Sequence, residues 1–182
     1  MALTGRRSLK ETWEVLENRG EKMPRDSLGR PFVPPRMPSY DDEAPLGFSF
    51  FRSRVEDADF SNSLLPRTFF GRSLLERVSF RNTDLSESRM CWNDFNKCDF
   101  SDADLSRCDM RASIFKECKF NRATLERADL RHSSFKDCDF TDAKLNGAIG
   151  EERNDDLHHS LNKEQEGSME RHAEPGPEPT GG

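Results

Sequence analysis

Residues 98–110 have the sequence CDFSDADLSRCDM, in which a small residue, an aspartate and a large apolar residue recur every five positions. The three triplets are Cys98-Asp99-Phe100, Ala103-Asp104-Leu105 and Cys108-Asp109-Met110. A five-residue period fits neither the 3.6-residue period of a helix nor the two-residue period of a strand. The small and the large residue lie two positions apart, so both point to one face of a short extended segment. The other residues must turn the chain, which makes each unit one short side of a coil.

The same unit continues in phase through the middle of the chain. From Phe50 to Leu145 every fifth residue is large and apolar, which makes twenty units without an insertion. Grouping these residues by fifteen mixes the residue types, whereas grouping by twenty sorts them. One column is entirely phenylalanine and another entirely leucine: Phe60, Phe80, Phe100, Phe120 and Phe140, and Leu65, Leu85, Leu105, Leu125 and Leu145. The pattern therefore predicts coils of four sides and about five coils, which at ~4.8 Å per coil form a rod about 24 Å long.

The unit resembles the consensus of the pentapeptide-repeat family, which is roughly Ala-Asp/Asn-Leu-x-x. The segments that carry this resemblance are Ala58-Asp59-Phe60, Ala103-Asp104-Leu105 and Ala128-Asp129-Leu130, and it extends over about residues 46–149. The resemblance implies an all-β fold, a right-handed quadrilateral β-helix. It also implies that the large residue and the small one two positions earlier point inward, and that neighbouring coils pair like strands.

The two ends of the chain lack the repeat. In residues 1–45, we expect a helix that begins at the N-cap Ser8 and ends at Gly20. A proline-rich extended arm follows, and we expect it to pack on the first coil and cap it through Phe32 and Val33. Residues 150–182 are acidic and polar, and we predict that they form a mostly disordered tail, in which only Leu157 and Leu161 indicate a short helical turn. This tail has no apolar helix of the kind through which members of the family dimerise, so a monomer is favoured, with a dimer left open.

Composition and charge exclude several classes of protein. Only 33% of the 182 residues are hydrophobic and 34% are charged, which a narrow, regularly filled rod explains. The rod is neutral, with 17 acidic and 17 basic residues, and residues 150–182 carry the net charge of −6. This is not the basic footprint of a nucleic-acid-binding protein. The sequence has neither an apolar run long enough for a membrane span nor a signal peptide, so we expect a cytoplasmic protein with reduced thiols.

Catalytic and metal-binding groups do not form a recognisable set. His132 lies at a predicted corner, the other three histidines lie in the tail, and the aspartates occupy repeating surface positions. We therefore predict no enzymatic activity, no cofactor and no metal site. The column Cys98, Cys118 and Cys138 is interpreted as small buried thiols, because parallel side chains in a column do not converge on a metal. Cys91 is expected to be an exposed free thiol.

Apolar side chains at outward positions are the most informative surface feature. The predicted partner-binding residues fall on or beside the first side of the coil and the adjoining corner: Phe51, Phe69, Arg72, Leu74, Trp92 and Ile114. Arg72 stacks next to Trp92 in the four-sided register, which predicts a cation–π contact. Such a patch marks an interface. Its occupant is either the N-terminal arm or a separate protein, and the sequence leaves both open.

These observations predict a non-enzymatic module that binds a protein. The family resemblance implies two protective or neutralising roles, namely protection of DNA gyrase or another type II topoisomerase and immunity against a toxin. The neutral rod does not favour mimicry of DNA by charge, and it lacks the projecting loops of topoisomerase-protecting members. The alternative is a structural scaffold or spacer, in which the arm and the tail make the binding contacts.

Overall fold

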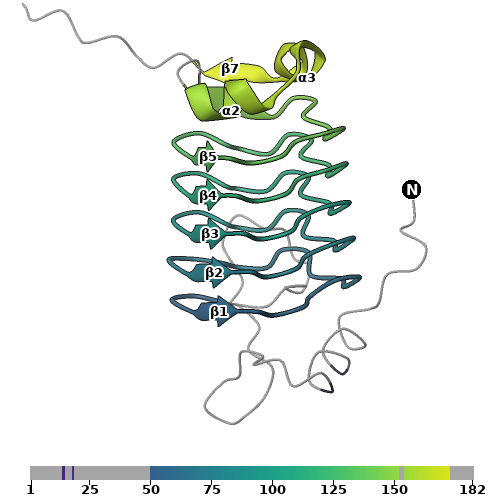
Figure 1. Ribbon diagram of the computed structural model, residues 1–182, viewed down its shortest axis with the longest axis vertical. Helices are drawn as coiled ribbons and strands as arrows, with labels where there is room; N and C mark the ends of the chain where they lie inside the picture. Colours follow the sequence, from purple (N-terminus) through teal and green to yellow (C-terminus); the bar gives the residue numbers. More distant parts are fainter. Residues whose placement is uncertain (1–13, 15–17, 19–49, 152–153, 173–182) are drawn as a thin grey trace, which may run out of the picture.

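The computed structural model describes residues 50–151 and 154–172, together with Glu14 and Asn18, which are helical (Figure 1). The remainder of the expected N-terminal helix and the proline-rich arm lie outside the described residues. In the part that is described, the chain winds into a stack of coils with β1 at one end and a small helical unit at the other (Figure 1).

The coils have four sides, as the twenty-residue grouping predicts. Five short strands, one from each coil, form a parallel sheet in sequential order: β1 (Arg54–Glu56), β2 (Leu74–Glu76), β3 (Asp94–Asn96), β4 (Ile114–Lys116) and β5 (Ser134–Lys136). Each strand pairs with the next in a twenty-residue register, so that Val55 lies beside Leu75 and Leu75 beside Phe95. Parallel bridges on the other sides keep the same register. The fold is therefore an all-β repeat solenoid.

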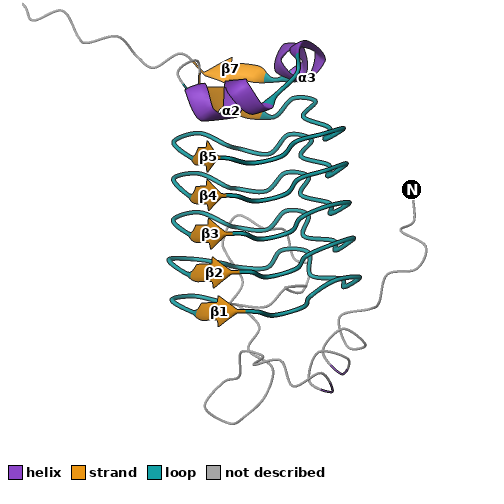
Figure 2. Ribbon diagram, viewed as in Figure 1, coloured by secondary structure: helices purple, strands orange, loops and turns teal. Residues whose placement is uncertain are grey.

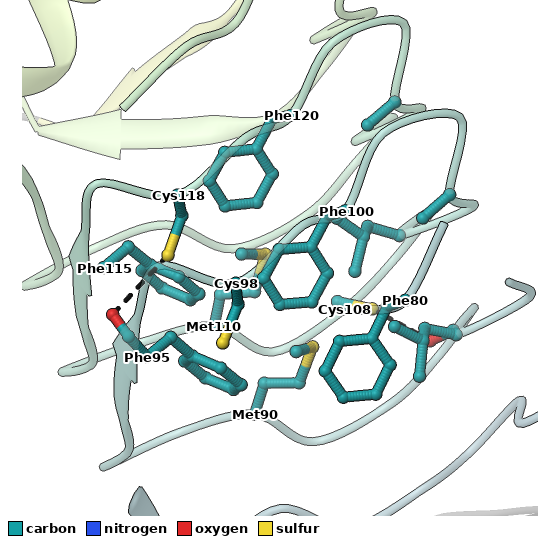
Figure 3. Close-up of a cluster of buried hydrophobic side chains, with 14 of the residues drawn as sticks. Phe80, Met90, Phe95, Cys98, Phe100, Cys108, Met110, Phe115, Cys118 and Phe120 are labelled. Carbon is teal, nitrogen blue, oxygen red and sulfur yellow. Dashed lines mark hydrogen bonds between the residues drawn. The ribbon is translucent and has the colours of Figure 1, made fainter. Parts of the chain in front are cut away.

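The interior is filled by columns of identical or similar side chains (Figure 3). The rings of Phe80, Phe100 and Phe120 stack at centroid distances of 5.1 Å between successive coils. Phe95 and Phe115 stack in the neighbouring column at 4.8 Å, and Phe95 meets Phe100 edge-on at 5.6 Å. All these side chains are fully buried, and each contributes roughly 1.5–3 kcal/mol from removal of its surface from water. The inward direction of the large residues is thus confirmed.

Each corner of the coil uses a residue in the left-handed backbone region. These residues recur every five positions from Arg52 (φ 52°) to Asp142 (φ 58°), and Gly147 follows at φ 66°. At many corners the turn is closed by a backbone hydrogen bond, such as that from the Ala103 N–H to the Phe100 carbonyl at 3.0 Å. A positive φ at the third residue is the geometry of a type II turn. Most corner residues here are charged rather than glycine.

One inward column is polar and forms a buried ladder. Asn93 stands between Ser73 and Ser113 in this column, and it is the clearest departure from the small residues of that position. Its side-chain oxygen accepts a hydrogen bond from the Ser73 N–H at 2.9 Å, and its amide group donates to the Phe70 carbonyl. Ser113 continues the ladder by accepting from the Asn93 N–H at 3.0 Å and donating to the Met90 carbonyl at 2.6 Å. The ladder therefore satisfies backbone groups in the interior of the rod.

The last coil is closed by an ordered cap, which Figure 2 shows as the only helical part among residues 50–151 and 154–172. It consists of α2 (Asp155–Ser160), α3 (Lys163–Ser168) and two parallel strands, β6 (Ile149–Glu151) and β7 (Glu170–His172). The prediction of a disordered tail is therefore wrong for residues 154–172, although the indicated helical turn at Leu157 is present in α2. Residues 173–182 lie outside the described part.

The cap needs few apolar residues because it covers only one coil end. Leu157 is fully buried against the core. The side-chain amide of Gln165 donates to the carbonyls of Phe140 and Ala143, at 2.8 and 3.0 Å. Asn154 donates in the same way to the Ser133 carbonyl at 2.6 Å. Polar side chains thus pair with backbone groups of the last coil, which is why an acidic, low-hydrophobicity segment folds here.

Candidate partner-binding surface

The predicted partner-binding residues lie on one side of the rod and its adjoining corner. Among the residues that the structure describes, the exposed large hydrophobic side chains are Phe51, Trp92 and Ile114, with exposed fractions of 47%, 67% and 52%. All three belong to the predicted set. Phe69 and Leu74 are half-buried and Arg72 is exposed. We call these six residues, together with Gly71, the apolar surface.

The lower part of the apolar surface is a pair of stacked rings, which we call the aromatic shelf (Phe51, Phe69 and Gly71). The rings of Phe51 and Phe69 are nearly parallel, with centroids 5.6 Å apart and an interplanar angle of 13°. They lie close to the backbone of Gly71, where an added Cβ would be 2.5 Å from Phe69 Cζ and 3.0 Å from Phe51 Cδ2. A glycine at this outward position therefore lets the two rings approach the coil.

The cation–π contact of this region differs from the expected one. The guanidinium group of Arg52 lies 5.2 Å from the centroid of the Phe51 ring. In the described part of the chain, no such contact joins Arg72 to Trp92. Arg52 was not singled out from the sequence because Arg–aromatic neighbours in the chain are common. Arg52 directly follows Phe51 in the chain. The expected contact between Arg72 and Trp92 would instead have joined side chains from two successive coils.

The upper part of the surface is centred on Trp92, which occupies a left-handed corner at φ 61°. Ile114 belongs to the next coil and lies close to this corner, because its N–H donates to the carbonyl of Asn93 at 2.8 Å. Leu74 and Ile114 do not adjoin each other, since Asp94 pairs with Leu74 on one side and with Ile114 on the other. The six predicted residues thus form two apolar parts, interrupted by one exposed carboxylate, rather than one continuous patch.

The charged side chains elsewhere on the rod are mostly paired between coils. Arg77 binds Asp57 at 2.6 Å and Arg122 binds Asp102 at 2.7 Å. The hydrogen bond from each arginine lowers the pKa of its aspartate below the usual value. Pairs as exposed as these contribute little to stability, so we assign them to surface solubility and register rather than to a site.

The cysteine column consists of buried thiols, as predicted. Cys98, Cys118 and Cys138 point inward, and each donates to a carbonyl of the preceding coil, such as Cys118 Sγ to the Phe95 oxygen at 3.5 Å (Figure 3). Burial also raises the pKa of Cys108, on another side of the coil. Cys91 is half-buried rather than exposed, and its pKa is raised by burial and by the nearby Asp109 carboxylate. The raised pKa values make Cys91 and Cys108 poor nucleophiles at neutral pH.

The histidines near the end of the rod make structural contacts. His132 Nδ1 lies 2.5 Å from Glu151 Oε1, and His158 Nδ1 lies 3.4 Å from Glu166 Oε1 in the cap. Among the described residues, no group of three or more histidine, cysteine, aspartate or glutamate side chains is arranged to hold a metal ion. The helices in that same part are all too short or too polar to cross a membrane.

The twenty-residue register, the inward small and large residues and the left-handed corners define a solenoid of five-residue repeats. Two family models match the chain, the pentapeptide repeat region at residues 92–152 and pentapeptide repeats (8 copies) at residues 56–90. Together they cover more than half of its length, and the chain belongs to the pentapeptide-repeat family. A comparison with curated proteins finds no similar sequence.

Three solved structures illustrate what the chain resembles. HetL, a pentapeptide repeat protein involved in heterocyst differentiation regulation in Nostoc sp. strain PCC 7120, is 20% identical with a TM-score of 0.40, over 59% of this chain and 48% of HetL. The plasmid-mediated fluoroquinolone resistance protein QnrB1 is 14% identical with a TM-score of 0.43, over 56% and 68%. A pentapeptide repeat protein of the Arabidopsis thaliana thylakoid lumen is 24% identical with a TM-score of 0.32, over 56% and 61%. The chain thus spans about half the length of HetL.

Proposed function

We propose that the chain is a non-enzymatic protein-binding module that protects or neutralises its partner through the apolar surface. One observation carries this proposal: the three exposed large hydrophobic side chains of the described residues all belong to the apolar surface, Phe51 to its lower part and Trp92 and Ile114 to its upper part. Scattered exposed apolar residues need no explanation, but a group of them that includes a tryptophan is typical of an interface. The other large hydrophobic side chains of the described residues are buried or half-buried.

The role is either protection of a type II topoisomerase such as DNA gyrase or neutralisation of a toxin. Both roles come from the family, and both need a rigid rod that presents side chains at fixed spacing. The five cysteines are free thiols, which supports the expected cytoplasmic location, where thiols stay reduced. We propose that the module acts there without a cofactor.

The test is an affinity capture from lysate of the native host with three baits: the wild-type chain, Trp92→Asp and Arg127→Asp. Arg127 is the matched control because it is also exposed and also occupies a left-handed corner, at φ 57°. We expect one major partner, a topoisomerase subunit or a toxin domain, that is retained by wild type and Arg127→Asp and lost with Trp92→Asp. Equal retention by all three baits would exclude the apolar surface as the binding site.

A second variant tests the aromatic shelf without adding charge. Gly71→Ala places a methyl group where the Phe69 ring now lies, and because this ring is half-buried at the surface it can swing outward. We expect a folded protein with weaker capture of the same partner.

The scaffold alternative requires a different bait, one that ends at residue 172, since an earlier end would remove the cap. Loss of the partner from that bait, with retention by Trp92→Asp, supports the scaffold.

A further inference from the structure

The apolar surface carries an unusual group of arginines. Most arginines of the rod, residues 50–149, have a carboxylate within 4.0 Å. In the described part of the chain, the arginines of the rod without such an ion pair are Arg52, Arg72, Arg89 and Arg127. Three of these four lie at the aromatic shelf, whereas Arg127 lies further along the rod, at the corner before Asp129, which is two coils above Arg89. Arginines without an ion pair are therefore concentrated at the shelf.

The register places the three arginines close to the rings. Arg52 lies over the Phe51 ring, and Arg72 directly follows Gly71 in the chain. Arg89 is the bridge partner of Phe69 in the next coil. Arg89 also has Asp109 in the coil above it, but Asp109 is bound by Arg111 at 2.8 Å. The remaining unpaired carboxylate here is that of Asp94, beyond the Trp92 corner.

Flat apolar rings bordered by guanidinium groups bind a particular chemistry. The rings offer a face on which another aromatic or apolar side chain can stack. Each guanidinium group presents a planar set of N–H donors that fits a carboxylate with two parallel hydrogen bonds. Three cations around one aromatic pair therefore fit a peptide in which acidic residues flank an aromatic residue.

A nucleic acid is a poorer fit for this surface. Stacking on aromatic rings and contacts to arginine do occur in single-strand binding. However, that class uses a continuous positive groove, whereas the rod as a whole carries equal numbers of acidic and basic residues and the chain has a net charge of −6. The carboxylate of Asp94, beyond the Trp92 corner, would also repel a phosphate backbone.

We propose that the aromatic shelf docks an acidic segment of a partner protein, with an aromatic side chain of that segment on the rings of Phe51 and Phe69 and its carboxylates on Arg52, Arg72 and Arg89. This rests on the proposed function and specifies the chemistry of its partner. Docking in this form is driven by burial of the rings and steered by the arginines, so its affinity falls as salt screens the charges.

Trp92 supplies the readout. In the full chain with Trp13→Phe, Trp92 is the only tryptophan, so its fluorescence reports on the apolar surface alone. The probes are a twelve-residue peptide in which aspartates flank phenylalanine, a matched peptide with asparagine in place of aspartate, and a twelve-residue oligothymidylate. We expect saturable binding of the acidic peptide, about tenfold weaker binding of the asparagine peptide, and weakening of the acidic peptide by added salt.

Variants then locate the binding. Arg72→Gln and Arg89→Gln should each weaken the acidic peptide about two- to fivefold, as expected for exposed charge pairs, and together by the product of the two effects. Arg127→Gln, at the unpaired arginine furthest along the rod from the shelf, should leave binding unchanged. An equal effect of Arg127→Gln would mean general attraction to the rod and would overturn the proposal.

Other results identify other occupants and equally overturn it. Tighter binding of oligothymidylate than of the acidic peptide indicates a nucleic-acid ligand. Residues 40–43, Tyr-Asp-Asp-Glu, have the proposed chemistry within this chain. If replacing Asp41, Asp42 and Glu43 with their amides strengthens peptide binding at least about tenfold, the chain's own segment is the occupant. Equal binding of the acidic and asparagine peptides removes the role of the arginines but leaves the proposed function standing, because lysate capture tests the latter independently.

Discussion

The corner residues show how a sequence of ordinary amino acids tolerates a strained backbone. A left-handed conformation costs an L-residue about 1–2 kcal/mol relative to the right-handed one, and glycine avoids most of that cost. Most corners of this rod are charged residues, whose long side chains point into water and pair between coils. The corner strain recurs at every fifth residue, and the free energy gained by burying the inward side chains exceeds its cost.

Ala112 is the corner at which this strain can be measured most cleanly. It has φ 53° and a side chain too small to pair with anything, so Ala112→Gly should raise the free energy of unfolding by about 1 kcal/mol. The matched control is Ala103→Gly at a buried inward position, which should lower it by about 1–2 kcal/mol through loss of a buried methyl group and added chain entropy. Chemical denaturation of both variants checks the opposite signs. A loss of stability in Ala112→Gly would show that corner strain is not the dominant effect there.

Asn93 provides the second test at the scale of single residues. Asn93→Ala removes the acceptor of the Ser73 N–H and the donor to the Phe70 carbonyl, both inside the rod. Leaving buried groups unpaired costs about 1–3 kcal/mol, so we expect a loss of that size in the free energy of unfolding. Asn93→Ser should retain most of the stability, because Ser113 makes both kinds of bond one coil above. Thermal unfolding of the two variants side by side distinguishes a hydrogen-bonded ladder from simple space filling, for which serine would be no better than alanine.

Among the larger elements, the cap is the one that stabilises an exposed coil end. A solenoid leaves unpaired backbone groups at each end, and terminal capping units satisfy them. Here Gln165 performs this role with two hydrogen bonds into the last coil. We expect Gln165→Ala to lower the free energy of unfolding by about 1–3 kcal/mol. The exposed neighbour Glu164→Ala should have little effect. Hydrogen exchange of the last coil provides the measurement, and protection unchanged in Gln165→Ala would mean that α3 does not hold the coil closed.

The rod was predictable from the sequence and the cap was not, for a physical reason. Each position of the five-residue unit recurs twenty times and each position of the coil five times, so Phe60 and its column identify the register without any knowledge of the structure. Gln165 has no such repetition, and its role exists only because the carbonyls of Phe140 and Ala143 are unpaired at that end. The five-residue period predicts which side chains point outward, and to that extent the residues of the candidate surface were predictable. The stacking of Phe51 on Phe69 and the position of Arg52 depend on side-chain packing, which the period does not encode.

For the whole molecule, the sequential sheet order means that each coil contacts only its neighbours along the rod. Stability in such an array is a sum over coils and their interfaces, so opening begins at the weaker end and proceeds along the axis. The cysteines report on this process because they lie at increasing distances from the cap. Cys138 is in the last coil, Cys118 in the coil before it, and Cys98 in the third coil.

Alkylation of these thiols therefore measures where the rod opens. In the wild-type protein we expect only half-buried Cys91 to react within the lifetime of the native state, because the other four thiols are buried. A cap variant combines Leu157→Ala with Gln165→Ala. Truncation of the fully buried leucine lowers the free energy of unfolding by about 2–5 kcal/mol, in addition to the effect of the lost Gln165 hydrogen bonds. The order of labelling should then be Cys138 before Cys118 before Cys98, as mass spectrometry of peptides after timed alkylation can determine. If all three react at one rate in this variant, the five coils open as a single cooperative unit, and the rigidity proposed for partner binding extends over the full length of the rod.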